Sequence, residues 1–444
     1  YLRDSDQPFR KEAAMAKPPA LQAPRGTRDF YPEEMRQRSW LFAHFREVAR
    51  RMGFEEVDAP VVEHAELFTR KAGEEIVEQL YHFTMHDRHL ALRPEMTPSI
   101  ARMVMARAGA LRLPLRWFTV TQNWRYERMT RGRKREHFQW NMDVWGEPGV
   151  AAEAELLAAI FALLARIGLG AGQVRVQLNS RALLEDTLRA GVLRTRPELF
   201  APLCVVIDKL DKIGADAVIE QLCEPAGVVQ LSPEEARDVV ALLGTRSLDD
   251  ATAAAPPGSP AIADLRHLFE LLDAYGIAQF VDFDASVVRG LAYYTGIVFE
   301  AYDAERKLRA VCGGGRYDRL LEALGGPPIP AVGFGFGDVV IAELLADHGL
   351  LPALPRELDD VVCALGEAQR AAAIRVAERL RAGGRAVELV LGESRPKRVL
   401  ADADKAGARS VWLLGPDEAA RGVVKVRDLA TGTERDEPLN SEAT

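Results

Sequence analysis

Several features that would identify common classes of protein are scarce or missing in this sequence. The 444 residues include only four cysteines, and none of them forms a CxxC pair or a spacing typical of a zinc site. We therefore expect neither a disulfide framework nor a bound metal, and reduced thiols favour a cytoplasmic location. No apolar run approaches the roughly 20 residues that span a bilayer, so no membrane partner is expected.

An excess of positive charge is also missing. The chain has 57 basic and 65 acidic residues, which gives a formal net charge of −8. This balance excludes a uniformly basic coat, so any contact with nucleic acid must come from local basic patches. GxSxG and HExxH are absent, and the glycine-rich segments lack the GK[ST] ending of a P-loop. His82, His86 and His89 have a spacing typical of a helix but no partner set for a metal.

The patterns that are present predict both helices and an antiparallel sheet. Residues 33–52 carry apolar side chains at helical spacing, and 150–168 read as a buried helix. Segments 115–124 and 137–145 are rich in aromatic and β-branched residues, which predicts two strands joined as a hairpin. The three consecutive glycines at 313–315 are expected to form a turn.

The same patterns predict an α+β protein of several domains. The Pro/Ala-rich start is typical of a flexible segment. The last part of the chain alternates strand and helix around a core of its own. The expected divisions are a flexible leader (1–24), a catalytic domain (25–350) with a helical insertion (about 181–275), a linker (351–357) and a small α/β domain (358–444).

The most strongly charged segment connects the two strands of the hairpin. Residues 125–136 contain six basic and two acidic side chains inside an acidic protein. Arginine offers permanently charged donors in a planar fork that suits phosphate. Arg125 and Glu127 are two apart on an extended chain and so share a face. The segment indicates either a phosphate site or a solvated charged hairpin.

Three further clusters carry candidate site residues. In VVRGLAYYTG, Arg289 precedes a glycine, and tyrosine hydroxyls follow that could orient a small molecule. CGGGRYD allows close approach of the backbone. LRPEMTPS sets Glu95 and Thr97 between two prolines, where a helix-capping turn is the alternative. Core tyrosines and packed glycines are the structural alternatives for the other two clusters.

Taken together, these motifs resemble the histidyl-tRNA synthetase family, a group of class II aminoacyl-tRNA synthetases. RGTRDFYP is similar to the N-terminal signature, GFEEVDAPVVE to class motif 1, RYERMTRGRKREHFQ to motif 2 and PAVGFGFGD to motif 3. RGLAYYTG and GGGRYD resemble the two histidine-specific motifs. The resemblance runs from Arg25 to about Leu439, and the last domain resembles an anticodon-binding domain.

The resemblance implies an antiparallel class II catalytic sheet, a homodimer and two reaction steps. Histidine attacks the α-phosphate of ATP, with Mg²⁺ bridging ATP oxygens, and the acyl group then passes to the 3′ end of tRNA-His. Matching positions assign Arg125 and Arg289 to catalysis. They assign Arg125, Glu127, Arg133 and Arg309 to ATP; Glu95, Thr97, Gln139, Asp143, Tyr293, Tyr294 and Tyr317 to histidine; and Arg131 to the acceptor end of tRNA.

The sequence departs from the family pattern at three positions. Ala292 replaces an aspartate of the histidine motif, and Asp143 replaces a glutamate in the imidazole pocket. Val340 stands where motif 3 usually carries an arginine that faces ATP. We expect Arg309 to take over that role.

Two other functions share part of this pattern. The regulatory subunit of ATP phosphoribosyltransferase resembles the catalytic core, but it typically lacks the last domain and the histidine motifs. A prolyl- or threonyl-tRNA synthetase would carry a similar C-terminal domain. The threonyl enzyme needs cysteine and histidine zinc ligands, and we find no such set in this sequence.

Overall fold

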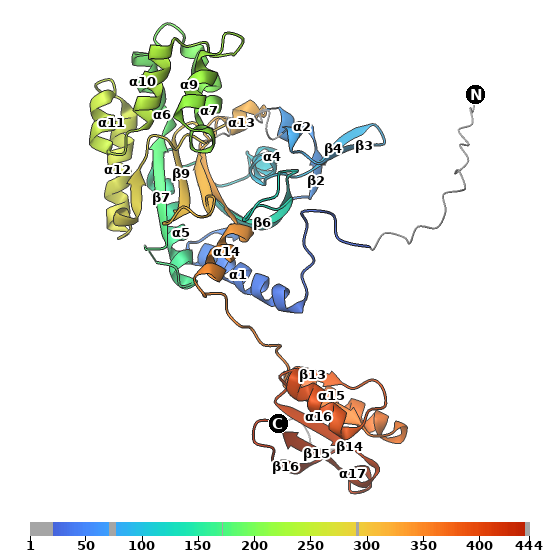
Figure 1. Cartoon of the computed structure of the whole chain (residues 1–444). Helices are drawn as coiled ribbons and strands as arrows, with labels where there is room; N and C mark the ends of the chain where they lie inside the picture. Colours follow the sequence, from blue (N-terminus) through green and yellow to red (C-terminus); the bar gives the residue numbers. More distant parts are fainter. Residues whose placement is uncertain (1–20, 71–76, 171, 290–292, 440–444) are drawn as a thin grey trace, which may run out of the picture. The chain divides into compact units, whose positions relative to one another are not determined.

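The computed structural model describes residues 21–70, 77–170, 172–289 and 293–439. The chain divides into two compact units, one ending at Leu351 and the other beginning at Pro352. In the first unit a large sheet lies at the centre, and helices gather at one end of it (Figure 1).

The large sheet is mainly antiparallel. Its order is β1-β5-β6-β11-β10-β9-β7-β8, and only the outer pairs β1–β5 and β7–β8 are parallel. The predicted hairpin is its longest pair. The strands are β1 (Glu55–Glu56), β5 (Leu115–Trp124), β6 (Glu136–Trp145), β7 (Val174–Ser180), β8 (Val281–Phe283), β9 (Ile297–Asp303), β10 (Cys312–Arg316) and β11 (Ala331–Gly337).

The apolar face of this sheet packs on two long helices, α1 (Pro32–Arg51) and α5 (Ala151–Arg166). Phe45 of α1 stacks on Trp140 of β6, with ring centroids 5.2 Å apart. At the end of the apolar core, α14 (Asp338–Asp347) contributes Ile341 and Leu344. Burial of these side chains holds the sheet in place. On the other face, a second apolar cluster covers one part of the sheet, and polar groups occupy another part.

Shorter elements flank the sheet. Helix α4 (Thr97–Arg107) packs with α13 (Leu320–Ala323) in a second core. A small sheet has the order β2-β4-β3, beside α2 (Glu66–Thr69). Its strands are β2 (Val62–His64), β3 (His82–Met85) and β4 (Arg88–Leu92). The helical reading of His82, His86 and His89 is therefore wrong, because they lie on the β3–β4 hairpin.

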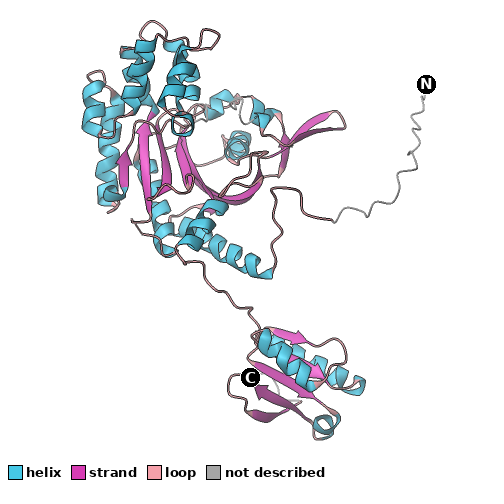
Figure 2. Ribbon diagram, viewed as in Figure 1, coloured by secondary structure: helices cyan, strands magenta, loops and turns pink. Residues whose placement is uncertain are grey.

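The predicted helical insertion lies between β7 and β8, where Figure 2 shows a group of helices. Part of it has a separate apolar core, whereas its last two helices pack into the main core of the large sheet. Ser232 forms a capping box with Glu235 at the start of α10. The helices are α6 (Arg181–Ala190), α7 (Phe200–Ile207), α8 (Leu210–Ile213), α9 (Ala215–Cys223), α10 (Pro233–Leu243), α11 (Leu248–Ala254) and α12 (Pro260–Ala274).

The second unit is a five-stranded mixed sheet in the order β13-β12-β14-β15-β16. Separate apolar clusters cover its two faces. Its elements are β12 (Asp360–Ala364), α15 (Arg370–Ala382), β13 (Val387–Leu389), α16 (Pro396–Lys405), β14 (Ser410–Leu414), α17 (Pro416–Ala420), β15 (Val423–Asp428) and β16 (Glu434–Pro438). The α+β prediction is confirmed.

One local prediction is wrong. The glycines at 313–315 form no turn, since all three lie within strand β10. They are paired with β9 on one side and β11 on the other. The side of the sheet that Gly313 and Gly315 share is crowded: a Cβ on Gly313 would overlap the guanidinium of Arg289, and one on Gly315 would lie 2.9 Å from the Tyr294 ring. The run therefore lets other side chains lie directly on the sheet.

Candidate active site

The polar face of the large sheet is shaped by glycines that alternate with aromatic residues. In β11, Phe334 and Phe336 point into the apolar core, so Gly333 and Gly335 face the other way. A Cβ on Gly333 would overlap the Asp143 carboxylate, and one on Gly335 would overlap the Gln139 amide. These two glycines therefore give β6 side chains room to lie across the sheet.

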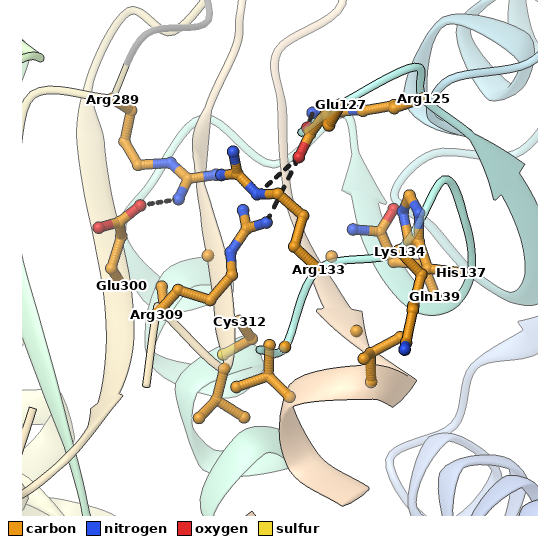
Figure 3. Close-up of a pocket in the computed structure, with 18 residues that line it drawn as sticks. Arg125, Glu127, Arg133, Lys134, His137, Gln139, Arg289, Glu300, Arg309 and Cys312 are labelled. Atoms are coloured by element: carbon orange, nitrogen blue, oxygen red, sulfur yellow. Dashed lines mark hydrogen bonds and ion pairs between the residues drawn. The ribbon is translucent and has the colours of Figure 1, made fainter. Parts of the chain in front are cut away.

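A cavity of about 190 Å³ opens on this polar face. Figure 3 shows arginines from three separate elements directed toward one another inside it. Such a concentration of guanidinium groups suits an anionic ligand such as a polyphosphate. Its basic lining residues are Arg125, Arg133, Lys134, Arg289 and Arg309, and its acidic ones are Glu127 and Glu300.

Arg125 follows β5 directly and is held by a neutral group. Its Nε donates to the carbonyl oxygen of Pro94 at 3.0 Å. This bond ties the charged connection to the PEMTP segment, in which Glu95 and Thr97 are buried. The Glu127 carboxylate lies 3.9 Å from Nη1 of Arg125. Arg125 is thus fixed in the cavity, with its charge only weakly paired.

Glu127 lies at the centre of three arginines. Its Oε2 is 2.6 Å from Nε of Arg133 and 3.8 Å from Nη1 of Arg309. The carboxylate is buried, which strengthens these attractions relative to surface pairs. The structure therefore gathers Arg125, Glu127, Arg133 and Arg309 in one place, although Arg309 comes from the connection between β9 and β10.

Arg289 enters the same cavity from the connection between β8 and β9. Its backbone has φ of 62°, and its carbonyl oxygen accepts from Nη1 of Arg181 at 3.3 Å. Its guanidinium lies against Gly313 and pairs with Glu300. Burial alone would lower the pKa of Arg289, but the charges of Glu300 and Tyr294 and the hydrogen bonds to both side chains together outweigh it and raise the pKa above the usual value.

Val340 lines the cavity at the position of the missing arginine. It lies at the start of α14, beside the tip of the charged connection. A Cβ on Gly132 would be 3.3 Å from Val340 Cγ2 and 3.8 Å from Arg309 Cγ. Val340 and Arg309 therefore approach the same point from two different elements.

Arg131 is the one predicted site residue of the charged connection that points elsewhere. Its Nε lies 3.0 Å from the Glu343 carboxylate, and its Nη2 lies 2.5 Å from Asp347. Both partners are on α14, and the arginine side chain is half-exposed. Arg131 thus fastens the connection to the surface of α14 and does not line the cavity.

The predicted histidine-binding residues form a buried cluster beside the cavity. The Tyr317 hydroxyl donates to Oδ1 of Asp143, and the Tyr293 hydroxyl donates to Glu95 Oε2 at 2.8 Å. The rings of Tyr293 and Tyr317 are 5.7 Å apart, edge to face. Gln139 lies on the same face of β6 as Asp143 and lines the cavity, and its amide oxygen accepts from Asn123 Nδ2 at 3.3 Å.

Asp143 combines deep burial with an unused acceptor. Its Oδ2 has no hydrogen-bond partner among the described residues. Burial raises the pKa of Asp143 to about 7; the hydrogen bond from Tyr317 opposes the shift and the charge of Glu95 adds to it. Burial, followed by the nearby Asp143, raises the pKa of Tyr317 well above its usual value, so the phenol keeps its proton. Because the single Tyr317 O–H is already donated to Oδ1, the free group of this pair is the acceptor Oδ2 of Asp143.

Lys134, His137 and Glu300 also line the cavity, although the sequence did not predict them as site residues. His137 lines the cavity, and burial followed by the charge of Arg125 lowers its pKa to about 3, so it is a neutral imidazole. Glu300 pairs with Arg289. His137 and Glu300 both lie on the polar face of their strands, so strand register could have identified them once the pairing was known. Ala292, the third departure from the family pattern, lies outside the described residues.

Over residues 21–70, 77–170, 172–289 and 293–439, no three histidine, cysteine or acidic side chains come close enough to hold a metal ion. Within those same ranges, no helix combines the length and the apolar character needed to cross a membrane.

Comparison with known proteins identifies both units. A family model described as histidyl-tRNA synthetase matches residues 26–337, and one described as anticodon binding domain matches 360–441. A protein of Arabidopsis thaliana named histidine–tRNA ligase, chloroplastic/mitochondrial, is 50% identical over 92% of this chain and 83% of its own length. The histidine–tRNA ligase of Opitutus terrae is 42% identical over 93% of this chain and 95% of its own.

Solved structures agree on the fold. Histidyl-tRNA synthetase from Nostoc sp. PCC 7120 superposes with a TM-score of 0.73 at 23% identity, over 94% of this chain and 97% of its own. A Bacillus halodurans protein, described as an ATP phosphoribosyltransferase regulatory subunit/histidyl-tRNA synthetase, gives a TM-score of 0.72 at 25% identity, over 90% and 99% of the two chains. The sheet described above is therefore the class II synthetase sheet.

Proposed function

Because this chain belongs to the histidyl-tRNA synthetase family and its function is that of a histidine–tRNA ligase, we propose that the arginine-lined cavity is where histidine is activated. The enzyme uses ATP to form histidyl-adenylate and then transfers the histidyl group to tRNA. The observation that carries the site assignment is that Arg125 and Arg289, from distant segments, line one cavity beside the Asp143–Tyr317 pair.

Catalysis of the first step is electrostatic. The carboxylate of histidine attacks the α-phosphorus of ATP, and pyrophosphate leaves. Negative charge gathers on the phosphate oxygens in the transition state, so fixed cations lower the barrier. Arg125 and Arg289 contact the α-phosphate from two sides. Glu127 accepts from the adenine amino group, and Arg133 exchanges Glu127 for a phosphate oxygen when ATP binds.

Histidine is recognised by complementary donors and acceptors. A neutral imidazole has one ring N–H and one bare ring nitrogen. Oδ2 of Asp143 accepts from the N–H, and a tyrosine hydroxyl from the cluster of Tyr293, Tyr294 and Tyr317 serves the other nitrogen. Glu95, Thr97 and Gln139 hold the α-amino group. Aromatic walls exclude water and strengthen each of these bonds.

Mg²⁺ is proposed to bind through the nucleotide. The two carboxylates lining the cavity, Glu127 and Glu300, are both engaged by arginines. The described residues therefore supply few oxygen ligands, which fits an ion held chiefly by phosphate oxygens and water. Bound there, the ion would neutralise charge on the leaving pyrophosphate.

The acceptor end of tRNA is proposed to enter from the side of the insertion. A second hollow shares the four cavity arginines and extends to Lys212 of α8, Arg246 and Arg306. These added cations suit a phosphate backbone. Arg131 contributes from the other side, because its exposed pairs with α14 are worth little and can be exchanged for phosphate.

Arg309 is expected to replace the motif 3 arginine on ATP. Arg309→Gln should raise the KM for ATP about 10-fold or more, the scale of one charged hydrogen bond, with little change in the KM for histidine. Adding Val340→Arg should restore the KM, since both positions approach the same point. Steady-state ATP–pyrophosphate exchange measures this, with Arg266→Gln on the exposed face of α12 as control. An unchanged KM for ATP in Arg309→Gln would rule out this role.

A homodimer is proposed on the basis of apolar side chains on the small sheet. Val62 of β2 is 42% exposed, and Phe83 and Met85 of β3 are 37% and 52% exposed. Sedimentation of the full chain should give twice the 49.0 kDa monomer mass, because such a patch favours association. The double substitution Phe83→Asp with Met85→Asp should lower the measured mass toward that of the monomer. A monomeric parent protein would contradict the proposal.

We also propose a cytoplasmic location, which the few unpaired cysteines favour. An organelle is the alternative, because the Arabidopsis relative is named as a chloroplastic/mitochondrial enzyme. Imaging a fluorescent fusion of the full-length protein beside organelle markers tests it. Signal confined to an organelle would overturn it.

A further inference from the structure

The cavity contains a carboxylate that the reaction itself does not call for. Glu300 lies on the polar face of β9, opposite Gly313 of β10 and Gln177 of β7. It lines the cavity proposed to bind a triphosphate. A negative charge at this place repels the triphosphate. We therefore expect the Glu300 carboxylate to have another role that offsets this repulsion.

Both oxygens of Glu300 are engaged. Oε1 accepts from Nη1 of Arg289, and Oε2 accepts from the hydroxyl of Tyr302, two residues along the same strand. Figure 3 shows the contact with Arg289. With two donors from different directions, the carboxylate cannot rotate freely. Its orientation is set by Tyr302, and it in turn sets the orientation of the guanidinium.

Arg289 depends on that contact. Within the described residues, Glu300 is the only acidic side chain paired with it, and its Nε has no hydrogen-bond partner. A long arginine side chain loses rotamer entropy when it is ordered, so it stays in one orientation only where contacts hold it. The backbone is anchored through Arg181, and Gly313 leaves a slot for the guanidinium. At its charged end, Arg289 contacts the Glu300 carboxylate and also forms a hydrogen bond with Tyr294; Glu300 is the charged one of these two partners.

The two catalytic arginines are therefore held differently. Arg125 is fixed by the Pro94 carbonyl, which carries no net charge. Arg289 is fixed by the Glu300 carboxylate, whose negative charge weakens the attraction of the Arg289 guanidinium for phosphate. We propose that Glu300, oriented by Tyr302, is a positioning residue for adenylation: it presents the Arg289 guanidinium to the α-phosphate of ATP. This inference rests on the role proposed above for Arg289.

The test is a kinetic comparison of full-length variants in ATP–pyrophosphate exchange. Glu300→Gln should lower kcat about 10-fold or more, because the amide cannot accept from both donors. The KM for ATP should stay equal or fall, since a negative charge beside the triphosphate has been removed. Tyr302→Phe should lower kcat in the same direction by less. Glu305→Gln, which removes an exposed carboxylate paired with Lys307, serves as control.

A double variant separates positioning from a general structural effect. Once Arg289 is replaced by alanine, Glu300 has no guanidinium to hold, so Glu300→Gln should cause no further loss. Rates are normalised to active sites by the burst of adenylate formation. If the fall in kcat of the double variant equals the product of the falls in the two single variants, the two residues act independently and the inference is overturned. So would a kcat within threefold of the parent in Glu300→Gln, or a loss restored by raising Mg²⁺, which would make Glu300 a metal ligand.

The same set of variants tells failure of this inference from failure of the proposed function. If Arg289→Ala itself retains exchange within threefold, the catalytic role of Arg289 is wrong and the inference falls with it. If Arg289→Ala is severely impaired while Glu300→Gln is not, only the positioning role is wrong.

Discussion

Histidine-dependent ATP–pyrophosphate exchange is expected to fall roughly 10²-fold or more in Arg289→Ala, the scale of losing one preorganised donor at a developing negative charge. The guanidinium lies on Gly313 inside the cavity, where few waters can replace it. Because it acts chiefly in the transition state, kcat should account for most of the loss, and the KM for histidine should change little.

The fold of this variant should survive. Arg289 lies outside the apolar clusters that hold the sheet, and its change to alanine removes an ion pair that lines the cavity. Circular dichroism should show unchanged secondary structure. Arg266→Ala, an exposed arginine on α12, provides a matched control for loss of positive charge. Exchange within about threefold of the parent enzyme would show that Arg289 is not a catalytic residue.

Asp143→Asn is expected to raise the KM for histidine about 10- to 10²-fold, the scale of a charge-assisted hydrogen bond. The Tyr317 hydroxyl donates to Oδ1, so the amide oxygen should keep that place and turn its NH₂ toward the imidazole N–H. Two donors would then face each other. The KM for ATP should be unaffected, and exchange titrated with histidine measures both constants.

The same substitution should stabilise the protein at high pH. The pKa of Asp143 is raised to about 7 by burial, so the folded state binds this proton more tightly than the unfolded state does. The ionised carboxylate therefore destabilises the fold above pH 7, and this cost fades as the pH falls from 7 toward 4. Asp143→Asn should melt at a higher temperature than the parent at pH 8, and the difference should shrink toward pH 5. A constant difference would contradict the burial argument.

Residues that lie close together in sequence were the easiest to predict. The basic connection between β5 and β6 was evident from composition, and it brings Arg125, Glu127 and Arg133 together because the hairpin closes on itself. The segment of about 181–275 was predicted to be mostly helical, and helices α6 to α12 occupy it. In both cases local patterns decide local structure.

Long-range register was harder to predict from local patterns. The glycines at 313–315 look like a turn in isolation, and only the pairing with β9 and β11 makes them a strand. Nothing in the segment VFEAYD marks Glu300 as a site residue, and its role becomes evident only when the structure places it beside Arg289. Arg131 has the same chemistry as Arg133, yet Glu343 and Asp347 of a distant helix draw it to the surface. Such competition between partners cannot be read from spacing.

The most direct test of the central claim is a crystal structure with a non-hydrolysable sulfamoyl analogue of histidyl-adenylate. We expect nitrogen atoms of both Arg125 and Arg289 at about 3 Å from the oxygens that replace the α-phosphate, the usual distance of such hydrogen bonds. Asp143 should contact the imidazole. Either guanidinium more than about 6 Å from those oxygens, beyond any direct hydrogen bond, would contradict the account.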